Sequence, residues 1–291
     1  MSRRGLFLFI LVGFLWGIPY LFIKVAVDPD NGFSPAIVVC LRTAIGAAIL
    51  IPIAIKQRQL FAAVRGWRYV GAYALLEMIG PWILIGTAEQ KISSGLAGLL
   101  VASVPIWATI FASMRGDKTV WQRKRLFGIV VGFIGLIAVV GIESITGSAD
   151  PLSIAMVLVA SIGYSYAVMM VQGALPHVSG IAINAVAMAM TAIFYLPWTI
   201  AQWPTHEISQ GAIRAIIGLG VLSTGAAFAA FFTLANIIGV ARGSLVTYLN
   251  TAFAVVLGVI ILKEPLTVGI ILGLPLVLIG SYFASRKPAD A

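Results

Sequence analysis

Long apolar stretches separated by short polar breaks make up most of the chain. A helix needs roughly 20 mostly apolar residues to cross about 30 Å of hydrocarbon, and ten stretches come close to that length. The pattern therefore predicts ten transmembrane helices joined by short loops. Their expected bounds are Leu6 to Val27, Ser34 to Ile55, Trp67 to Thr87, Ser94 to Met114, Leu126 to Ile142, Ser153 to Gly173, Ile181 to Trp203, Ile213 to Ile238, Gly243 to Leu262 and Val268 to Ala284.

The composition agrees with a chain that lies mostly inside a lipid bilayer. Of its 291 residues, 60% are apolar and only 10% are charged, whereas soluble domains carry about 25% charged residues. The first stretch, after "MSRR", is too long for a signal peptide and lacks a small-residue cleavage site, so it is expected to be a span. The predicted fold class is an all-α integral membrane protein, with function located within the membrane.

The distribution of charge predicts the orientation. If the N-terminus is cytoplasmic, most basic residues fall on the inner side and most acids on the outer side, as the positive-inside rule requires. Both termini are then cytoplasmic, and the net charge of +9 is a topology signal that does not call for a nucleic-acid partner. The inner set is Arg3, Arg4, Lys56, Arg58, Arg65, Arg68, Arg115, Lys118, Arg123, Lys124, Arg125, Arg242, Arg286 and Lys287. The outer set is Lys91, Arg214, Lys263, Asp28, Asp30, Glu89, Glu143, Asp150, Glu207 and Glu264.

Two short matches indicate an internal repeat. "WGIPY" at 16–20 resembles "IGYSY" at 162–166, and "GIVVGFIG" at 128–135 resembles "GLPLVLIG" at 273–280 in glycine spacing. Five spans in each half is an odd number, so the second copy must be inverted across the membrane. The expectation is two five-helix repeats, 1–148 and 149–291, with a substrate site near the midplane between them, as in secondary transporters.

Longer motifs resemble the ten-helix, EamA-type branch of the drug/metabolite transporter superfamily. They are "WGIPYLFIK", "CLRTAIGAAIL", "GTAEQKISSGLAGLL" followed by "VPIWATIFA", and "ARGSLVTYLNTAFAVVLGVIILKEPLT", and their order covers nearly the whole chain. The resemblance implies two inverted repeats, a central cavity and export of a small metabolite by alternating access. Exporters of aromatic amino acids belong to this branch.

The chain also departs from its wider superfamily. Small multidrug members carry an essential glutamate in their first helix, but neither the first nor the sixth span here contains an acid. Relatives that carry phosphate esters use basic residues deep in their late helices, and the ninth and tenth spans here have none in their interior. Phosphorylated substrates are therefore disfavoured.

Glu77 and Arg42 are the charged residues deepest in the predicted spans. An intramembrane charge should face protein or water and have a partner. Counted from the outer ends, Arg42 lies about eight residues and Glu77 about ten residues deep, so at 1.5 Å per residue the two can pair. Lys24, nearer the outer surface, either snorkels to the interface or adds positive charge to the same region. Three interpretations stay open: Arg42 receives a substrate carboxylate, Glu77 carries a proton, or the two form a structural ion pair.

Aromatic and polar residues at midspan are the other candidates for substrate binding. Rings can stack on an apolar substrate side chain, and hydroxyl or amide groups inside a membrane must bond to something. Lipid contact, packing and interhelical hydrogen bonds are the alternatives in each case. The candidates are Trp16, Tyr20, Trp82, Ser103, Tyr164, Thr247, Tyr248 and Asn250.

Proline and glycine mark expected kinks and close contacts. Six prolines lie in or near spans, and Gly80-Pro81 beside Glu77 is the expected kink for alternating access. "GIVVG" at 128–132 and "GIILG" at 269–273 give the fifth and tenth spans a small-residue face, interpreted as packing between the repeats, with homodimerisation as the alternative. The prolines are Pro19, Pro52, Pro81, Pro105, Pro197 and Pro275.

Other function classes fit the sequence less well. An intramembrane enzyme is disfavoured because the five aspartates and both histidines lie in loops or tails, and no HExxH or GxSxG motif is present. A channel stays an alternative, because a central polar cavity does not show whether both ends open together, but inverted repeats and broken helices favour a carrier and the lack of a repeated ring of charge counts against a selective ion pore. The single cysteine, Cys40, excludes disulfides and cysteine metal sites, so no cofactor or metal is expected. The resulting prediction is a cell-membrane exporter of small metabolites, amino acids favoured, with a proton-coupled exporter of drugs or quaternary cations as the alternative and monomer or homodimer left open.

Overall fold

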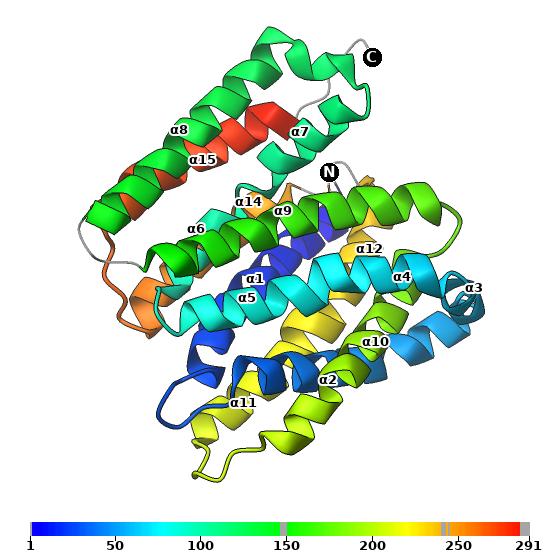
Figure 1. Ribbon diagram of the computed structural model, residues 1–291. Coiled ribbons are helices and arrows are strands. Elements are labelled where there is room, and N and C mark those ends of the chain that lie inside the picture. The colour runs from blue at the N-terminus through cyan, green and yellow to red at the C-terminus, as the bar shows by residue number, and fades with distance from the viewer. Residues whose placement is uncertain (1, 146–149, 240–242, 244, 286–291) are drawn as a thin grey trace.

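A computed structural model describes residues 2–145, 150–239, 243 and 245–285, and these form helices, turns and loops without a strand (Figure 1). Eight helical segments in this part of the chain are long and apolar enough to cross a membrane, and two more apolar helices are shorter. Each coincides with a predicted span, with ends shifted by a few residues. The prediction of an all-α membrane fold is confirmed. Arg242, Arg286 and Lys287, assigned above to the inner side, lie outside the described residues.

The first half of the chain supplies five apolar segments. The third and fourth segments are each built from more than one helical piece, and a short helix α3 (Leu60–Arg65) and a 3-10 turn η2 (Lys118–Trp121) precede the third and fifth. The segments are α1 (Arg3–Ala26), α2 (Pro35–Lys56), α4 (Trp67–Ala74) with η1 (Leu75–Ile79) and α5 (Gly80–Glu89), α6 (Ser94–Val101) with α7 (Val104–Met114), and α8 (Arg123–Ile145).

The second half supplies the other five segments in the same order. The third of these, like the third of the first half, contains a π-helical stretch near its middle. The segments are α9 (Pro151–Ala174), α10 (Gly180–Ala201), α11 (Gln210–Gly218) with η3 (Leu219–Ala226) and α12 (Ala227–Ile238), α14 (Val246–Ile261), and α15 (Val268–Ser285).

Proline explains two of the helix interruptions. Pro81 has no N–H and cannot donate to the carbonyl of Glu77 four residues earlier, and the wider turn η1 lies directly before it. Pro105 stands in the first turn of α7, just after the chain leaves α6 at Ala102. At Gly80-Pro81, where a kink is expected, the segment changes from π-helical to α-helical geometry without leaving the helical conformation. Pro19, Pro52, Pro197 and Pro275 lie inside continuous helices.

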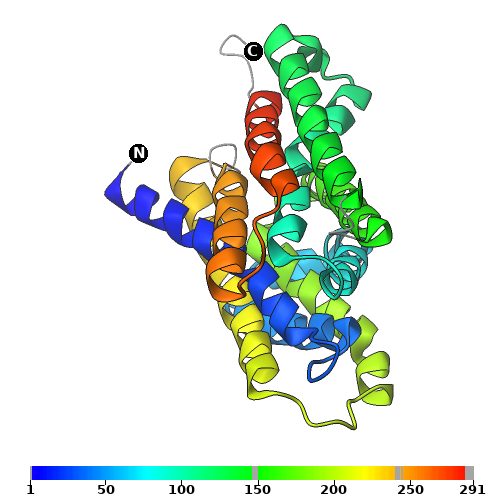
Figure 2. The same cartoon turned by 90° about the vertical axis from the view of Figure 1, so that its left-hand side faces the viewer.

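The helices form two groups. In one, α1 packs against α11, α12 and α14; in the other, α9 packs against α5, η1, α6 and α7. The groups meet where α6 contacts α14 and α1. The pairs α2 with α10 and α8 with α15 flank them, and α8 and α15 lie side by side in both views (Figures 1 and 2).

Glycine allows α8 and α15 to pack backbone to backbone. A Cβ on Gly280 would overlap the backbone of Gly132, and a Cβ on Gly128 would overlap that of Ala284. The interpretation of the small-residue faces as packing between the fifth and tenth spans is confirmed.

Gly280→Ala is expected to lower the free energy of unfolding by about 1 to 3 kcal/mol, because α8 and α15 must separate to admit the methyl group. Gly141→Ala, also on α8, is the matched control, since a Cβ there meets nothing within 4 Å. It should be neutral or stabilising by up to about 1 kcal/mol. Thermal unfolding of the purified protein measures both. Equal midpoints for the two variants would contradict the close packing.

Candidate functional site: a buried arginine, an unpaired glutamate and a closed end

Arg42 is a buried cation at the contact of α2 with η3. Its residue is 6% exposed, and its Nε and Nη2 donate to Oγ1 of Thr224 at 3.4 and 3.2 Å. The guanidinium carbon lies 3.7 Å from the centre of the Trp82 ring, close enough for a cation–π interaction. Among the described residues, no acid lies within 4.0 Å of Arg42. The close partners of the positive charge are therefore a neutral hydroxyl and an aromatic face, and the acid Glu89 acts on it only from beyond ion-pair distance.

Two tyrosines stand in the electrostatic surroundings of this arginine. Tyr20 on α1 and Tyr164 on α9 both interact with Arg42. Tyr20 is 8% exposed and lies against the surface of Gly98 on α6. Tyr164 packs against both large hydrophobic clusters of the bundle, so it bridges them. The two helix groups thus each supply a ring to the region of Arg42.

Glu77 lies in the π-helical turn η1 and has no ionic partner in the described part of the chain. Its Oε2 is buried and accepts no hydrogen bond. The hydroxyl groups of Tyr73 and Tyr164 lie near it. Of the three interpretations left open for these residues, the structural ion pair is not formed, because Arg42 is turned toward Thr224 of η3 and does not come within 4.0 Å of Glu77. Tyr164 interacts with both charges.

A second charged region lies at the predicted outer end of the bundle. Lys24, in the last turn of α1, donates its Nζ to the carbonyl oxygens of Glu89 at 2.6 Å and Ile92 at 2.9 Å. A lysine near helix C-terminal carbonyls is favourable for the α5 dipole. Lys24 therefore joins α1 to α5. It does not extend freely to the membrane interface, which was one of its two interpretations.

Glu264, in the loop between α14 and α15, binds the N-terminus of α6. Its carboxylate accepts from the backbone N–H and hydroxyl of Ser94, both at 2.8 Å, and from the N–H of Gly95 at 3.3 Å. A carboxylate at a helix N-terminus satisfies free N–H groups and favours the helix dipole. The helical hairpin α5–α6 is thus held from both sides by charges from the other helix group.

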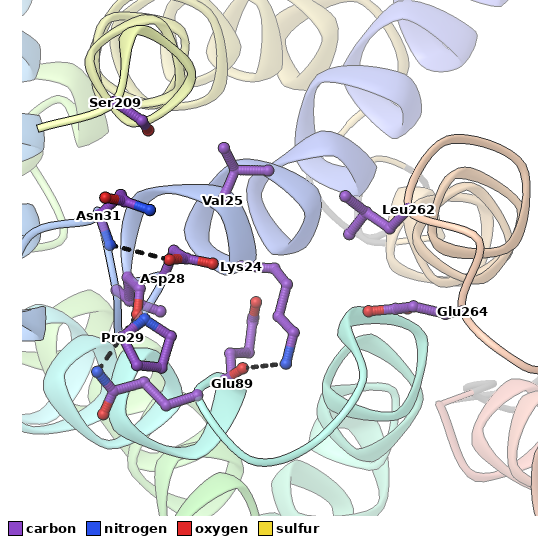
Figure 3. A pocket seen from close by; sticks show the side chains of 11 residues that line it. Lys24, Val25, Asp28, Pro29, Asn31, Glu89, Ser209, Leu262 and Glu264 are labelled. Carbon is purple, nitrogen blue, oxygen red and sulfur yellow. Dashed lines mark hydrogen bonds between the residues drawn. The ribbon is translucent and has the colours of Figure 1, made fainter.

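A cavity of about 360 Å³ lies beside this closure (Figure 3). Its charged lining residues are Lys24, Asp28, Glu89 and Glu264, and Val25 and Leu262 are among the apolar ones. Arg42 and Glu77 do not line it. Within the described residues, no group of three or more His, Cys, Asp or Glu side chains could hold a metal ion.

The structure brings together five of the sequence candidates, Tyr20, Arg42, Glu77, Trp82 and Tyr164, and not the other five. Trp16 packs on Phe228 and Phe231 of α12, with ring centroids 5.5 and 4.7 Å away. Ser103 donates to the carbonyl of Leu100 and accepts from Nε1 of Trp107, so its hydrogen bonds stay within its own span.

The polar cluster of α14 also serves helix packing. Asn250 is 8% exposed, its Oδ1 accepts from Thr251, and its carbonyl lies against Gly17 of α1. The carbonyl of Thr247 accepts from Thr251, and the Tyr248 ring lies edge-on to Tyr282 of α15. For these residues the structural alternative fits the contacts.

Three features escaped the sequence interpretation. Thr224, the hydrogen-bond partner of Arg42, is one hydroxyl among many in an apolar span. Tyr73 donates its hydroxyl to Asn184 of α10 at 3.1 Å. Glu89 stands next to the polar run "QK" and was assigned to an outer loop, but the structure makes it the last residue of α5 and fully buried. The available signal was the position of Glu89 itself, between the end of an apolar span and the polar residues Gln90 and Lys91.

Comparison with known proteins supports a transporter fold. A solved crystal structure matches with a TM-score of 0.67 and 16% identity, over 98% of this chain and 97% of that chain, which speaks to the fold alone. The transporter YoaV of Bacillus subtilis, described as uncharacterized, is 26% identical over 289 residues, 96% of this chain and 97% of its own. The inner membrane transporter YedA of Escherichia coli K12, described in the same way, is 24% identical and covers 95% of this chain and 91% of its own.

The family comparison covers both halves of the chain. The model of the EamA-like transporter family matches residues 3–141 and again 151–286. Together with the apolar helices, this makes the protein a multi-pass transporter of the cell membrane. The chain belongs to the EamA-like transporter family.

Proposed function

We propose that the protein exports small zwitterionic metabolites, with aromatic and other large apolar amino acids favoured, by alternating access through a central site at Arg42. The observation that carries this proposal is a buried guanidinium without an acidic partner in the described structure. Burying an unpaired charge is unfavourable, and a substrate carboxylate would neutralise it. Arginine offers a planar fork of donors that can bind such a carboxylate in a bidentate manner.

The surroundings of Arg42 fit the rest of an aromatic amino acid. Glu77, also unpaired, can receive the ammonium group of the substrate. Trp82, Tyr20 and Tyr164 supply aromatic faces for an apolar side chain. A zwitterion would thus meet the buried Arg42 and the half-buried Glu77 with a charge of opposite sign at each, which neither a simple anion nor a simple cation can do.

As part of the proposal, two inverted repeats with cytoplasmic termini give the site access to each side of the membrane in turn. Support comes from the double match of the family model and from π-helical stretches in the third segment of each half. The main helix pairs also combine equivalent segments: α2 with α10, and α8 with α15. Helix irregularities near the centre of inverted repeats are typical of substrate sites in secondary transporters.

A proton-coupled exporter of drugs or quaternary cations is the second candidate. It is favoured by one observation, the unpaired carboxylate of Glu77 near the Tyr73 and Tyr164 rings. Aromatic rings around a carboxylate are suited to a quaternary ammonium group.

Transport by the purified protein in liposomes separates the two candidates. Uptake of labelled phenylalanine, threonine and methionine, and of a quaternary ammonium dye, is measured with and without a pH gradient. We expect saturable amino-acid flux, highest for phenylalanine. Proton-driven dye flux without amino-acid flux would replace the first proposal by the second.

A further inference from the structure

Glu89 is a sealed acid beneath the cavity at the predicted outer end. The residue is 0% exposed, and neither carboxylate oxygen accepts a hydrogen bond. Figure 3 shows its side chain directed toward the cavity, between Lys24 and Asp28. Lys24 acts on this carboxylate electrostatically but forms no ion pair with it, because its ammonium donates to two backbone carbonyls.

The other charged groups around Glu89 do not supply the missing donor. Tyr20 and Lys24 on α1, Arg42 on α2, and Glu264 after α14 act on it electrostatically. Glu264 is occupied at the N-terminus of α6, and Oδ1 of Asp28 accepts from the N–H groups of Asp30 and Asn31, both at 3.0 Å. Of the three acids that line the cavity, Glu89 alone has an unsatisfied carboxylate.

The same region closes this end of the bundle. Lys24 on α1 binds the C-terminal end of α5, and Glu264 in the loop after α14 binds the N-terminal end of α6. The turn between α5 and α6, which belong to the group of α9, is thus held by residues of the group of α1 and α14. Gln90 adds a hydrogen bond from its Nε2 to the carbonyl of Val27 at 3.3 Å. Separation of the two groups would break these contacts and hydrate Glu89.

We propose that Glu89 is a proton-binding site that controls this closure: it holds a proton while the end is sealed and releases it when the end opens. An ionised carboxylate without a hydrogen-bond donor is disfavoured in a dry site, whereas a hydrated one is stable. The closed state therefore binds one proton more than the open state. Lower pH stabilises the closed end, and higher pH favours opening.

The inference rests on the proposed alternating access only in requiring that this end opens. One linked proton changes the ratio of open to closed molecules by at most about tenfold per pH unit. This dependence can be measured without any substrate, so a wrong substrate assignment would not affect the result.

A single cysteine reports on the opening. In a Cys40→Ala background, Ile92→Cys places a thiol at a position that is 1% exposed. The backbone carbonyl of this same residue accepts a hydrogen bond from Lys24. The full-length protein in lipid nanodiscs, where both faces are accessible, is treated with a water-soluble maleimide between about pH 6 and pH 8. Dividing each rate by that of the Glu89→Gln variant at the same pH removes the pH dependence of the thiol itself.

We expect this ratio to rise with pH by up to about tenfold per unit, because glutamine imitates the protonated acid and keeps the end closed. Glu207→Gln, which removes an exposed acid from the loop before α11, is the matched control, and with Glu89 present it should keep the pH dependence of the labelling ratio. A ratio that is constant with pH would overturn the proposal. The proposal would also fail if Glu207→Gln, and not Glu89→Gln, removed the pH dependence.

Discussion

The variant Arg42→Gln is expected to transport phenylalanine with a kcat/KM lowered by about 100-fold, equivalent to about 3 kcal/mol. Glutamine keeps a polar side chain, although a shorter one, and removes the charge and the planar fork that would bind the carboxylate. Because Arg42 has only Thr224 and Trp82 as close partners, little of this effect should come from loss of structure. Initial rates in proteoliposomes over a range of phenylalanine concentrations give the measurement.

Two further variants make this prediction specific to Arg42. Arg42→Lys keeps the charge but loses bidentate geometry, so we expect a smaller loss of about tenfold. Arg214→Gln, at an exposed position of α11, makes the same chemical change away from the site and should transport like the unsubstituted protein. If Arg42→Gln and Arg214→Gln gave the same rates, the carboxylate would have to bind elsewhere.

The spans were predictable because the thickness of the hydrocarbon layer sets the length of a transmembrane helix. That length appears in the sequence as the number of consecutive apolar residues. Packing of α8 on α15 was predictable for a similar reason, since Gly128, Gly132 and Gly280 leave no side chain that could keep the backbones apart. Proline likewise marked the break at Pro81. Each of these signals lies within one short stretch of sequence, although the packing of α8 on α15 joins two stretches that are far apart.

The partner of a buried charge depends on helix rotation, which the sequence does not contain. Counting residues along each span places Arg42 and Glu77 at a similar depth in the membrane. This count gives the position along the helix axis but not the direction in which each side chain points. The side chain of Arg42 leaves α2 toward Thr224, a residue 182 positions away in the sequence. Glu89 shows the same limit, because its burial results from contact of α1 with the end of α5 and not from its polar neighbours.

Glu77→Gln is expected to transport phenylalanine at least tenfold less efficiently while leaving the protein as stable as before, or more stable. The lower transport follows from loss of the charge that would bind the ammonium group, by an interaction of about 1.5 to 3 kcal/mol. Stability should not fall, because no partner of Glu77 is left unpaired by the change. Breaking a buried ion pair would instead destabilise the protein by about 3 to 5 kcal/mol. Thermal unfolding therefore distinguishes an unpaired functional acid from a structural pair.

Substrate analogues test the same residue by chemistry. 3-Phenylpropionate lacks the ammonium group, so its inhibition of phenylalanine transport should be weak in the unsubstituted protein and should not weaken further in Glu77→Gln. Phenethylamine lacks the carboxylate, so its inhibition should be lost in Glu77→Gln but not in the matched variant Glu207→Gln. Glu77→Gln leaving inhibition by phenethylamine unchanged would remove Glu77 from the ammonium site. The proposed preference for a zwitterion depends on Arg42 and Glu77 forming no ion pair with each other, as the structure shows.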